Sequence, residues 1–157
     1  MSRHIQSIED AAETLSDLSR LMEGQRFAAL ATCGESGAYA SLVGFAATDD
    51  LKAILFCTPK TTKKFANLLR EPKVSLLVDN SGNAETDVAQ AMAATATGAC
   101  SEVPPPEREA ALDVYLLKHP YLADFARSPN CALMRIEVAA YHVVRRFQDV
   151  VEVSMAP

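Results

Sequence analysis

The residues with the clearest potential for chemistry lie between positions 58 and 64, where three lysines and three threonines occur within seven positions. This basic cluster is a local exception, because the whole chain carries a net charge of −5. Thr61 or Thr62 would cap a helix that follows, which places Lys63 and Lys64 in its first turn. Cations there oppose the helix dipole at a cost of about 0.3–1 kcal/mol each, and a bound anion reverses that cost. Backbone N–H groups, threonine hydroxyls and two ammonium groups together are typical of a phosphate site.

A solvated, lysine-rich helix with an ordinary cap would show the same spacing, and spacing alone leaves the two interpretations open. The cluster lacks the glycines of a Walker loop. Nucleic acid would also require phosphate contacts, but the acidic total charge argues against such a partner.

The cysteines and histidines predict neither a metal site nor a nucleophile. Four widely spaced cysteines with apolar neighbours and no C-x-x-C motif predict buried free thiols: Cys33, Cys57, Cys100 and Cys131. No histidine lies near a cysteine in the sequence, so a zinc motif is absent. His119, which precedes Pro120, is expected to end a helix, and His142 alternates with apolar residues on a strand.

The elements that must position the basic cluster follow from hydrophobic periodicity. An amphipathic helix is expected over residues 7–22, with Ser7 as a capping residue. Short apolar or alternating runs bounded by turn residues predict strands over residues 26–32, 38–47, 52–58, 73–79, 92–103, 131–137 and 141–153. Further helices are expected over residues 60–70, 107–118 and 121–127.

These elements predict an all-β to α+β fold. Short connections between the first three strands indicate an antiparallel meander, and the crossover helices that a parallel sheet needs are missing. We expect a six-stranded antiparallel β-barrel with peripheral helices. With 157 residues, 49% of them hydrophobic, the chain has the size of a single domain (1–157), in which the N-terminal helix (1–24) packs on the barrel.

The chain also lacks sequence features of membrane or exported proteins. No uncharged apolar run approaches the ~20 residues that span a bilayer. The first residues lead into charged positions, without the apolar stretch of a secretory signal. The expected location is therefore the cytoplasm.

Several segments resemble one known family. They are the strand segments 40–43 and 54–58, Thr62-Lys63-Lys64-Phe65-Ala66-Asn67-Leu68, and Glu71-Pro72-Lys73-Val74-Ser75-Leu76. Together they resemble the FMN-binding split barrel (Greek key) of the pyridoxamine 5′-phosphate oxidase-like family. The segment 141–148 also resembles the last strand of a flavin-binding subgroup.

The resemblance implies an FMN site at the basic cluster. Lys63 and Lys64 would hold the FMN phosphate, while Thr62 would donate a hydroxyl and cap the helix. Thr58 would lie beside the flavin ring, and Asn67 would reach the cofactor from the helix.

A neighbouring strand and a second subunit would complete this site. The resemblance implies that Ser41, Leu42 and Val43 run along the flavin, with backbone groups at the ring edge or ribityl chain. It also implies a homodimer with each FMN at the subunit interface. Arg145 or Arg146 would come from the other chain, and only one of them can reach the cofactor because neighbouring strand residues face opposite ways.

The chain departs from true pyridoxamine phosphate oxidases, which have an arginine near the position of Ser41 and an arginine–histidine pair near the C-terminus. Here the C-terminal region reads Arg146-Phe147-Gln148-Asp149, and the glutamine that the oxidases use on the fifth strand is replaced near Ala93. The resemblance therefore implies a flavoprotein oxidoreductase with another, unidentified substrate and with NAD(P)H or a reduced flavin as electron donor. The alternative is a non-catalytic split barrel that binds flavin or haem for storage, sensing or haem handling.

Overall fold

The computed structural model describes residues 3–4, 8–146 and 149–155. The expected capping residue Ser7, and Phe147 and Gln148, lie outside the described residues. The helices are α1 (Ile8–Gly24), α2 (Lys63–Arg70), α3 (Asp87–Gln90), α4 (Pro105–Lys118), the 3₁₀ turn η1 (Pro120–Leu122) and α5 (Ala123–Arg127). The strands are β1 (Arg3–His4), β2 (Phe27–Gly34), β3 (Gly37–Ala47), β4 (Ala53–Pro59), β5 (Lys73–Asp79), β6 (Met92–Glu102), β7 (Cys131–Arg145) and β8 (Asp149–Ser154).

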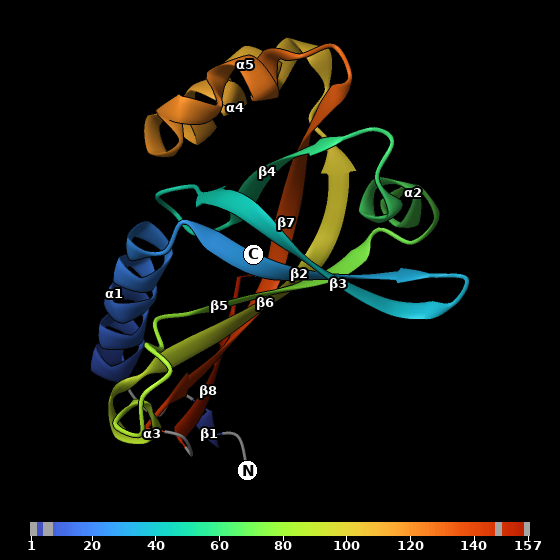
Figure 1. Ribbon diagram of the computed structural model, residues 1–157. Helices are drawn as coiled ribbons and strands as arrows, with labels where there is room; N and C mark the ends of the chain where they lie inside the picture. Colours follow the sequence, from blue (N-terminus) through green and yellow to red (C-terminus); the bar gives the residue numbers. More distant parts are fainter. Residues whose placement is uncertain (1–2, 5–7, 147–148, 156–157) are drawn as a thin grey trace.

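Six antiparallel strands form a closed barrel in the order β7-β4-β3-β2-β5-β6, with β6 pairing back onto β7 (Figure 1). The expected six-stranded split barrel with peripheral helices is therefore confirmed. Outside the barrel, β8 pairs antiparallel with β7, and β1 pairs parallel with β8.

Strand β4 shows why two apolar clusters form. Its side chains are buried on both faces of the strand. Even-numbered side chains such as Ile54 and Phe56 point into the barrel core. Odd-numbered side chains such as Leu55 and Cys57 point outward, into a second apolar cluster under α4 and α5. A continuous apolar run in the sequence thus reflects a strand covered from both sides.

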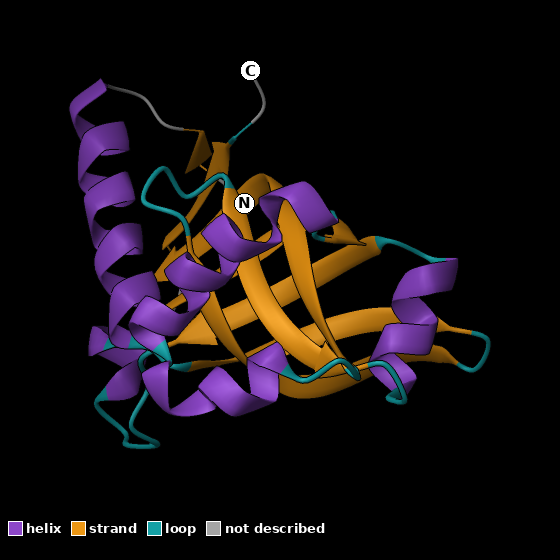
Figure 2. Ribbon diagram, turned by 90° about the horizontal axis from the view of Figure 1, so that it is seen from above, coloured by secondary structure: helices purple, strands orange, loops and turns teal. Residues whose placement is uncertain are grey.

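The helices lie around the barrel in three places (Figure 2). Helix α1 contributes Leu18, Leu21 and Met22 to the barrel core. Helix α2 lies on the other side of the barrel in Figure 1, and α4, η1 and α5 form a lobe above it. None of the described helices is both long enough and apolar enough to cross a membrane.

Two sequence predictions near the C-terminus are wrong. The sequence predicts that one strand ends at residue 137, but β7 continues to Arg145, because a β-bulge takes up a shift in its pairing with β6. The register shifts between Thr97 and Gly98, and a Cβ at Gly98 would overlap the carbonyl oxygen of Glu137, so glycine fits there. The strand expected over residues 141–153 is instead the end of β7 and the separate strand β8.

Candidate cofactor site

The basic cluster is positioned by the N-terminus of α2. Thr62 is the N-cap, with extended backbone (φ −81°, ψ 154°), and its Oγ1 accepts a hydrogen bond from the Phe65 N–H at 3.3 Å. The structure therefore selects Thr62 over Thr61 as the cap. Lys63 and Lys64 are the first two helical residues, and the first turn contains no acidic residue.

The two lysines differ in their surroundings. Lys63 is exposed, and its Nζ lies 4.7 Å from the centre of the Tyr39 ring. Lys64 is half-buried, and this burial lowers the pKa of its ammonium group. Among the described residues, no carboxylate lies within ion-pair distance of either lysine, whereas Lys60 pairs with Glu102 at 3.6 Å. The described part of the chain thus provides no counter-ion for the positive charge at this helix N-terminus.

Two threonine hydroxyls connect α2 to the end of β4. Thr58 is fully buried, and its Oγ1 lies 2.9 Å from Thr62 Oγ1. Thr62 Oγ1 also donates to the carbonyl oxygen of Pro59 at 3.0 Å. We call Thr58, Thr62, Lys63 and Lys64 the α2 cap site.

Strand β3 has an unpaired edge beside this site. It pairs with β4 only at Phe45, Ala46 and Ala47, although it pairs with β2 as far as Gly37. The peptide N–H of Phe45 bonds to the β2 side, at Arg26 O, and the bonding side alternates along an antiparallel strand. The peptide groups of Leu42 therefore face the side that β4 leaves open.

Ser41 adds a second unmet polar group. Its side chain points to the same face as Val43 and Phe45, which belong to the barrel core. Its Oγ is buried and has no hydrogen-bond partner among the described residues. An unpaired buried hydroxyl costs about 1–3 kcal/mol, so it marks a position where a ligand atom would be stabilising. Tyr39, on the same face, was not predicted from sequence, although the two-residue spacing from Ser41 would have indicated it.

Asn67 has a structural contact instead of pointing to solvent. It is buried, and its Nδ2 donates to Thr32 Oγ1 at 3.0 Å, which joins α2 to β2. A Cβ at Gly34 would overlap the Asn67 amide, so glycine allows this approach. The structure shows Asn67 positioning the helix, while its predicted contact with a cofactor stays a prediction.

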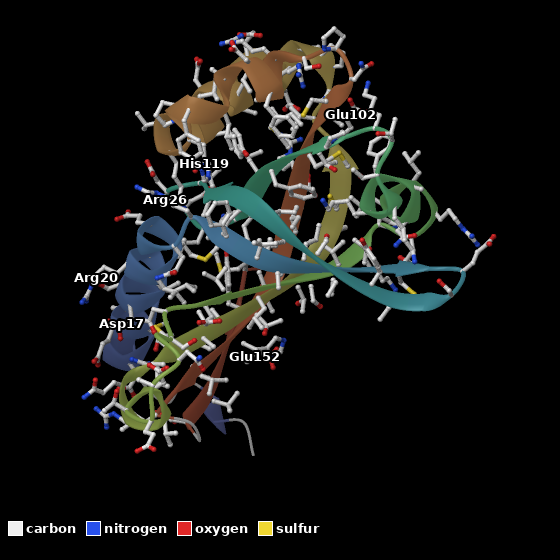
Figure 3. All side chains as sticks on the ribbon, viewed as in Figure 1. Asp17, Arg20, Arg26, Glu102, His119 and Glu152 are labelled. Carbon is white, nitrogen blue, oxygen red and sulfur yellow. The ribbon has the colours of Figure 1, made fainter. Side chains whose placement is uncertain are left out.

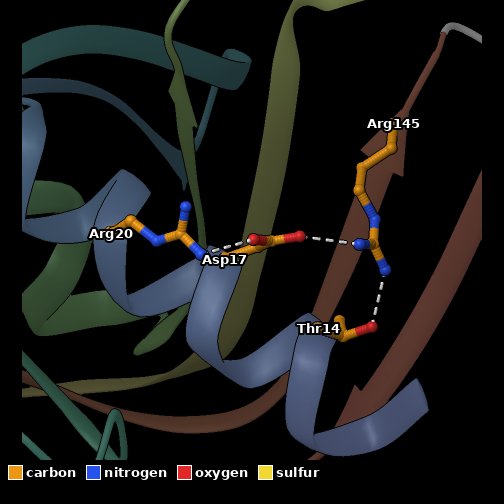
Figure 4. Close-up of polar contacts among 4 residues, drawn as sticks. All are labelled: Thr14, Asp17, Arg20 and Arg145. Atoms are coloured by element: carbon orange, nitrogen blue, oxygen red, sulfur yellow. Dashed lines mark hydrogen bonds and ion pairs between the residues drawn. The ribbon is translucent and has the colours of Figure 1, made fainter. Parts of the chain in front are cut away.

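Arg145 lies away from the other predicted residues within one chain. Arg145 is the last residue of β7. The α2 cap site lies near the other end of this strand, where the first residue, Cys131, pairs with Pro59. The Arg145 guanidinium donates to Asp17 Oδ2 at 2.7 Å and to Thr14 Oγ1 at 2.6 Å, both on α1 (Figure 4). Any contact of Arg145 with the α2 cap site would have to come from a second subunit.

The histidine predicted to end a helix is the C-cap of α4. His119 is fully buried where the helical lobe meets the barrel (Figure 3). Its Nε2 donates to the carbonyl oxygen of Phe45 at 2.7 Å, so Nδ1 accepts from the Tyr121 hydroxyl at 2.9 Å. Burial lowers the pKa of the imidazole, and both nitrogens are in use, which fits a structural role.

The described residues contain no group of three or more histidine, cysteine, aspartate or glutamate side chains that could hold a metal ion. The α2 cap site and the open edge of β3 offer ammonium, hydroxyl and peptide groups. The ammonium and N–H groups are hydrogen-bond donors, which suits an anionic ligand with further polar atoms.

The chain matches the family model described as pyridoxamine 5′-phosphate oxidase over residues 16–145. No curated protein matches it in sequence.

Solved structures show the same fold at low sequence identity. A heme-binding protein from Mycobacterium smegmatis has a TM-score of 0.77 and 16% identity, covering 89% of this chain and 57% of its own. An FAD-binding protein from Mesorhizobium loti has a TM-score of 0.64 and 15% identity, covering 82% of this chain and 91% of its own. General Stress Protein 26 from Bacillus anthracis has a TM-score of 0.68 and 14% identity, covering 91% of this chain and 99% of its own.

Proposed function

Because this chain belongs to the pyridoxamine 5′-phosphate oxidase family, we propose that it binds FMN at the α2 cap site and acts as an FMN-dependent oxidoreductase. The observation that carries the proposal is Lys64, a half-buried ammonium without a carboxylate partner among the described residues. The phosphate of FMN would supply the missing negative charge and accept hydrogen bonds from first-turn N–H groups.

Each residue of the site has a part in this proposal. Lys63 and Lys64 bind the phosphate, and Thr62 holds the helix N-terminus in place for it. Thr58 fixes Thr62 through the hydroxyl pair at 2.9 Å.

The unpaired edge of β3 would bind the rest of the cofactor. The Leu42 peptide groups and the Ser41 hydroxyl offer hydrogen bonds to polar atoms of the ribityl chain or ring, with Val43 beside them. The bound flavin would supply hydride transfer, and this chain would orient it and neutralise its phosphate.

We propose a homodimer with FMN at the subunit interface. The outer face of the barrel carries exposed apolar side chains, with Leu42 at 69%, Phe27 at 52% and Leu77 at 43% exposure. Ala29 on β2 pairs with Leu42 on β3 and with Leu77 on β5, so Leu42, Ala29 and Leu77 form one row across the three strands. Exposed apolar patches of this kind are typical of association surfaces, and this one lies next to Ser41 and Val43.

The substrate of the reaction is a small molecule other than pyridoxamine phosphate in this proposal, because Ser41 stands near the position of an expected arginine. NAD(P)H or a reduced flavin would be the electron donor. The visible spectrum of the purified protein tests this directly: a flavin spectrum that bleaches with NAD(P)H or another donor is expected. A bound flavin that no donor reduces would contradict the enzymatic part of the proposal.

A second candidate is a non-catalytic flavin- or haem-binding protein. Similarity to a heme-binding protein and to an FAD-binding protein favours it, since their fold is shared. A Soret band after reconstitution with haem, together with weak FMN binding, would support a haem-binding protein.

The FMN proposal has its own binding test. If two charged contacts bind the phosphate, the protein should bind FMN at least about 100-fold more tightly than riboflavin.

A further inference from the structure

Two buried cysteines lie together outside the candidate cofactor site. Cys57 is on β4 and Cys131 is the first residue of β7, and in the register of these strands they are diagonal neighbours. Both side chains belong to the second apolar cluster, under α4 and α5. Both thiols are free.

The two thiols have different surroundings. The Cys131 thiol donates a weak hydrogen bond to the carbonyl oxygen of Ala132 at 3.8 Å, and it lines a cavity whose lining does not include Cys57. The neighbouring Cys57 thiol and the charge of Arg108 hold the pKa of Cys131 below its usual range, whereas the neighbouring Cys131 sulfur and burial raise the pKa of Cys57. This direction, together with the place of Cys131 in the lining of the cavity, favours Cys131 over Cys57 as the attacking thiolate.

A cavity of about 620 Å³ gives access to Cys131. Cys131 lines it together with Lys60, Arg108 and Arg127. Lys60 and Arg127 are paired with Glu102 and Glu109, but Arg108 has no carboxylate partner within the described part of the chain. An unneutralised guanidinium beside a thiol stabilises the thiolate. The cavity thus brings small oxidants next to Cys131, whose side chain is only 4% exposed.

We infer that Cys131 and Cys57 form a peroxide-sensitive dithiol, with Cys131 as the attacking and Cys57 as the resolving cysteine. The Cys131 thiolate attacks one oxygen of a hydroperoxide, the O–O bond breaks, and the leaving oxygen takes a proton, which yields a sulfenic acid and water or an alcohol. The Cys57 sulfur then bonds to the Cys131 sulfur, the S–O bond breaks, and the Cys57 proton leaves with the hydroxyl as water. Two thiols are oxidised by two electrons and one peroxide is reduced.

The position of the pair places a bridge at the start of β7, close to the α2 cap site. Diagonal neighbours have Cα atoms about 7–8 Å apart, slightly more than an unstrained disulfide spans. Bridging therefore requires a small movement, which is easiest at Cys131, where β7 begins after a turn. The bridge would lie next to Thr58, which contacts Thr62 in the α2 cap site.

Hydrogen peroxide treatment of the reduced full-length chain tests the inference. A Cys33→Ser background removes the exposed thiol, which otherwise could join two chains. Blocking with N-ethylmaleimide and peptide mapping should find an intrachain Cys57–Cys131 disulfide, with loss of two hydrogen masses, reversed by dithiothreitol. Cys100 is the matched control, because it is buried, burial raises its pKa to about 12, and no neighbouring thiol acts on it. It should react at least about tenfold more slowly.

Two variants separate the roles of the cysteines. Cys57→Ser should leave a sulfenic acid on Cys131 that dimedone traps, and Cys131→Ser should leave Cys57 reduced. Reaction of Cys57 in Cys131→Ser at the original rate would overturn the assignment of roles. An unbridged Cys57–Cys131 pair in the peroxide-treated Cys33→Ser protein, or oxidation of Cys100 at an equal rate, would overturn the inference as a whole.

Discussion

Lys64 on α2 and Arg145 at the end of β7 are two cations, and among the described residues only Arg145 has a carboxylate partner. Arg145 donates to Asp17 and Thr14, and Asp17 also contacts Arg20 at 3.1 Å (Figure 4). Lys64 is half-buried at the N-terminus of α2 without a carboxylate partner in the described residues. A balanced cation stabilises the fold, whereas an unbalanced one that loses hydration indicates a site for a ligand.

The largest expected effect concerns ligand affinity. Replacing both lysines, as Lys63→Ala with Lys64→Ala, should weaken FMN binding by about 100-fold or more, since each charge-assisted contact contributes about 1.5–3 kcal/mol. Riboflavin affinity should change little, because riboflavin lacks the phosphate. Titration calorimetry with both ligands measures the difference, and Lys73→Ala, an exposed lysine on β5, is the matched control. Equal losses for both ligands would show that the lysines do not read the phosphate.

Removing the balanced cation should act on stability instead. Arg145→Met leaves Asp17 and the buried Thr14 hydroxyl without this partner, and the free energy of unfolding should fall by about 1–2 kcal/mol. This loss of stability is small for an ion pair with two hydrogen bonds, because the Arg145 and Asp17 side chains remain about one quarter exposed and solvent screens their charges. Chemical denaturation measures the change.

The same variant addresses the subunit interface. Titration of Arg145→Met with FMN should show lower affinity if Arg145 completes the site of the partner subunit, as the family resemblance implies. Unchanged FMN affinity would limit Arg145 to its contacts with α1.

Loss of the helix cap should have a smaller effect on stability. Thr62→Ala removes the bond from the Phe65 N–H and should lower the free energy of unfolding by about 1 kcal/mol. FMN affinity should fall as well, because the helix N-terminus becomes less ordered. Thr61→Ala is the control, since the exposed Thr61 is not the cap. An equal effect of both substitutions would contradict the assigned cap.

Lys118 differs from both cations, because its effect should appear only as a pH dependence of stability. Its Nζ donates to the carbonyl oxygen of Met22 at 2.7 Å and lies 3.9 Å from the centre of the Phe45 ring, yet burial lowers its pKa to about 8. Above pH 8 the unfolded chain holds the Lys118 proton more tightly than the folded chain, so this group makes stability rise with pH. Between pH 7.5 and 9.5, wild type should gain stability relative to Lys118→Met in urea denaturation. Parallel pH profiles would contradict the lowered pKa.

The α2 cap site was the part most readily predicted, because capping depends on local spacing. The positions of Thr62, Lys63 and Lys64 relative to the helix start follow from a few consecutive residues. The barrel followed from strand spacing and turn residues in the same way. By contrast, the register shift between Thr97 and Gly98 depends on the close approach of the Gly98 backbone to the carbonyl oxygen of Glu137. These residues are far apart in the sequence, so no local pattern encodes the contact.

The sequence by itself determined that a short helix would begin with two lysines in an acidic chain, since helix capping and net charge are local or summed properties. Only the tertiary structure decided which polar groups have partners. Asn67 bonds to Thr32 on β2, and Arg145 bonds to α1, whereas Ser41 has no partner within the described residues. The physical reason is that hydrogen bonds and ion pairs need distances near 3 Å between residues distant in sequence, and the closing of the barrel sets these distances.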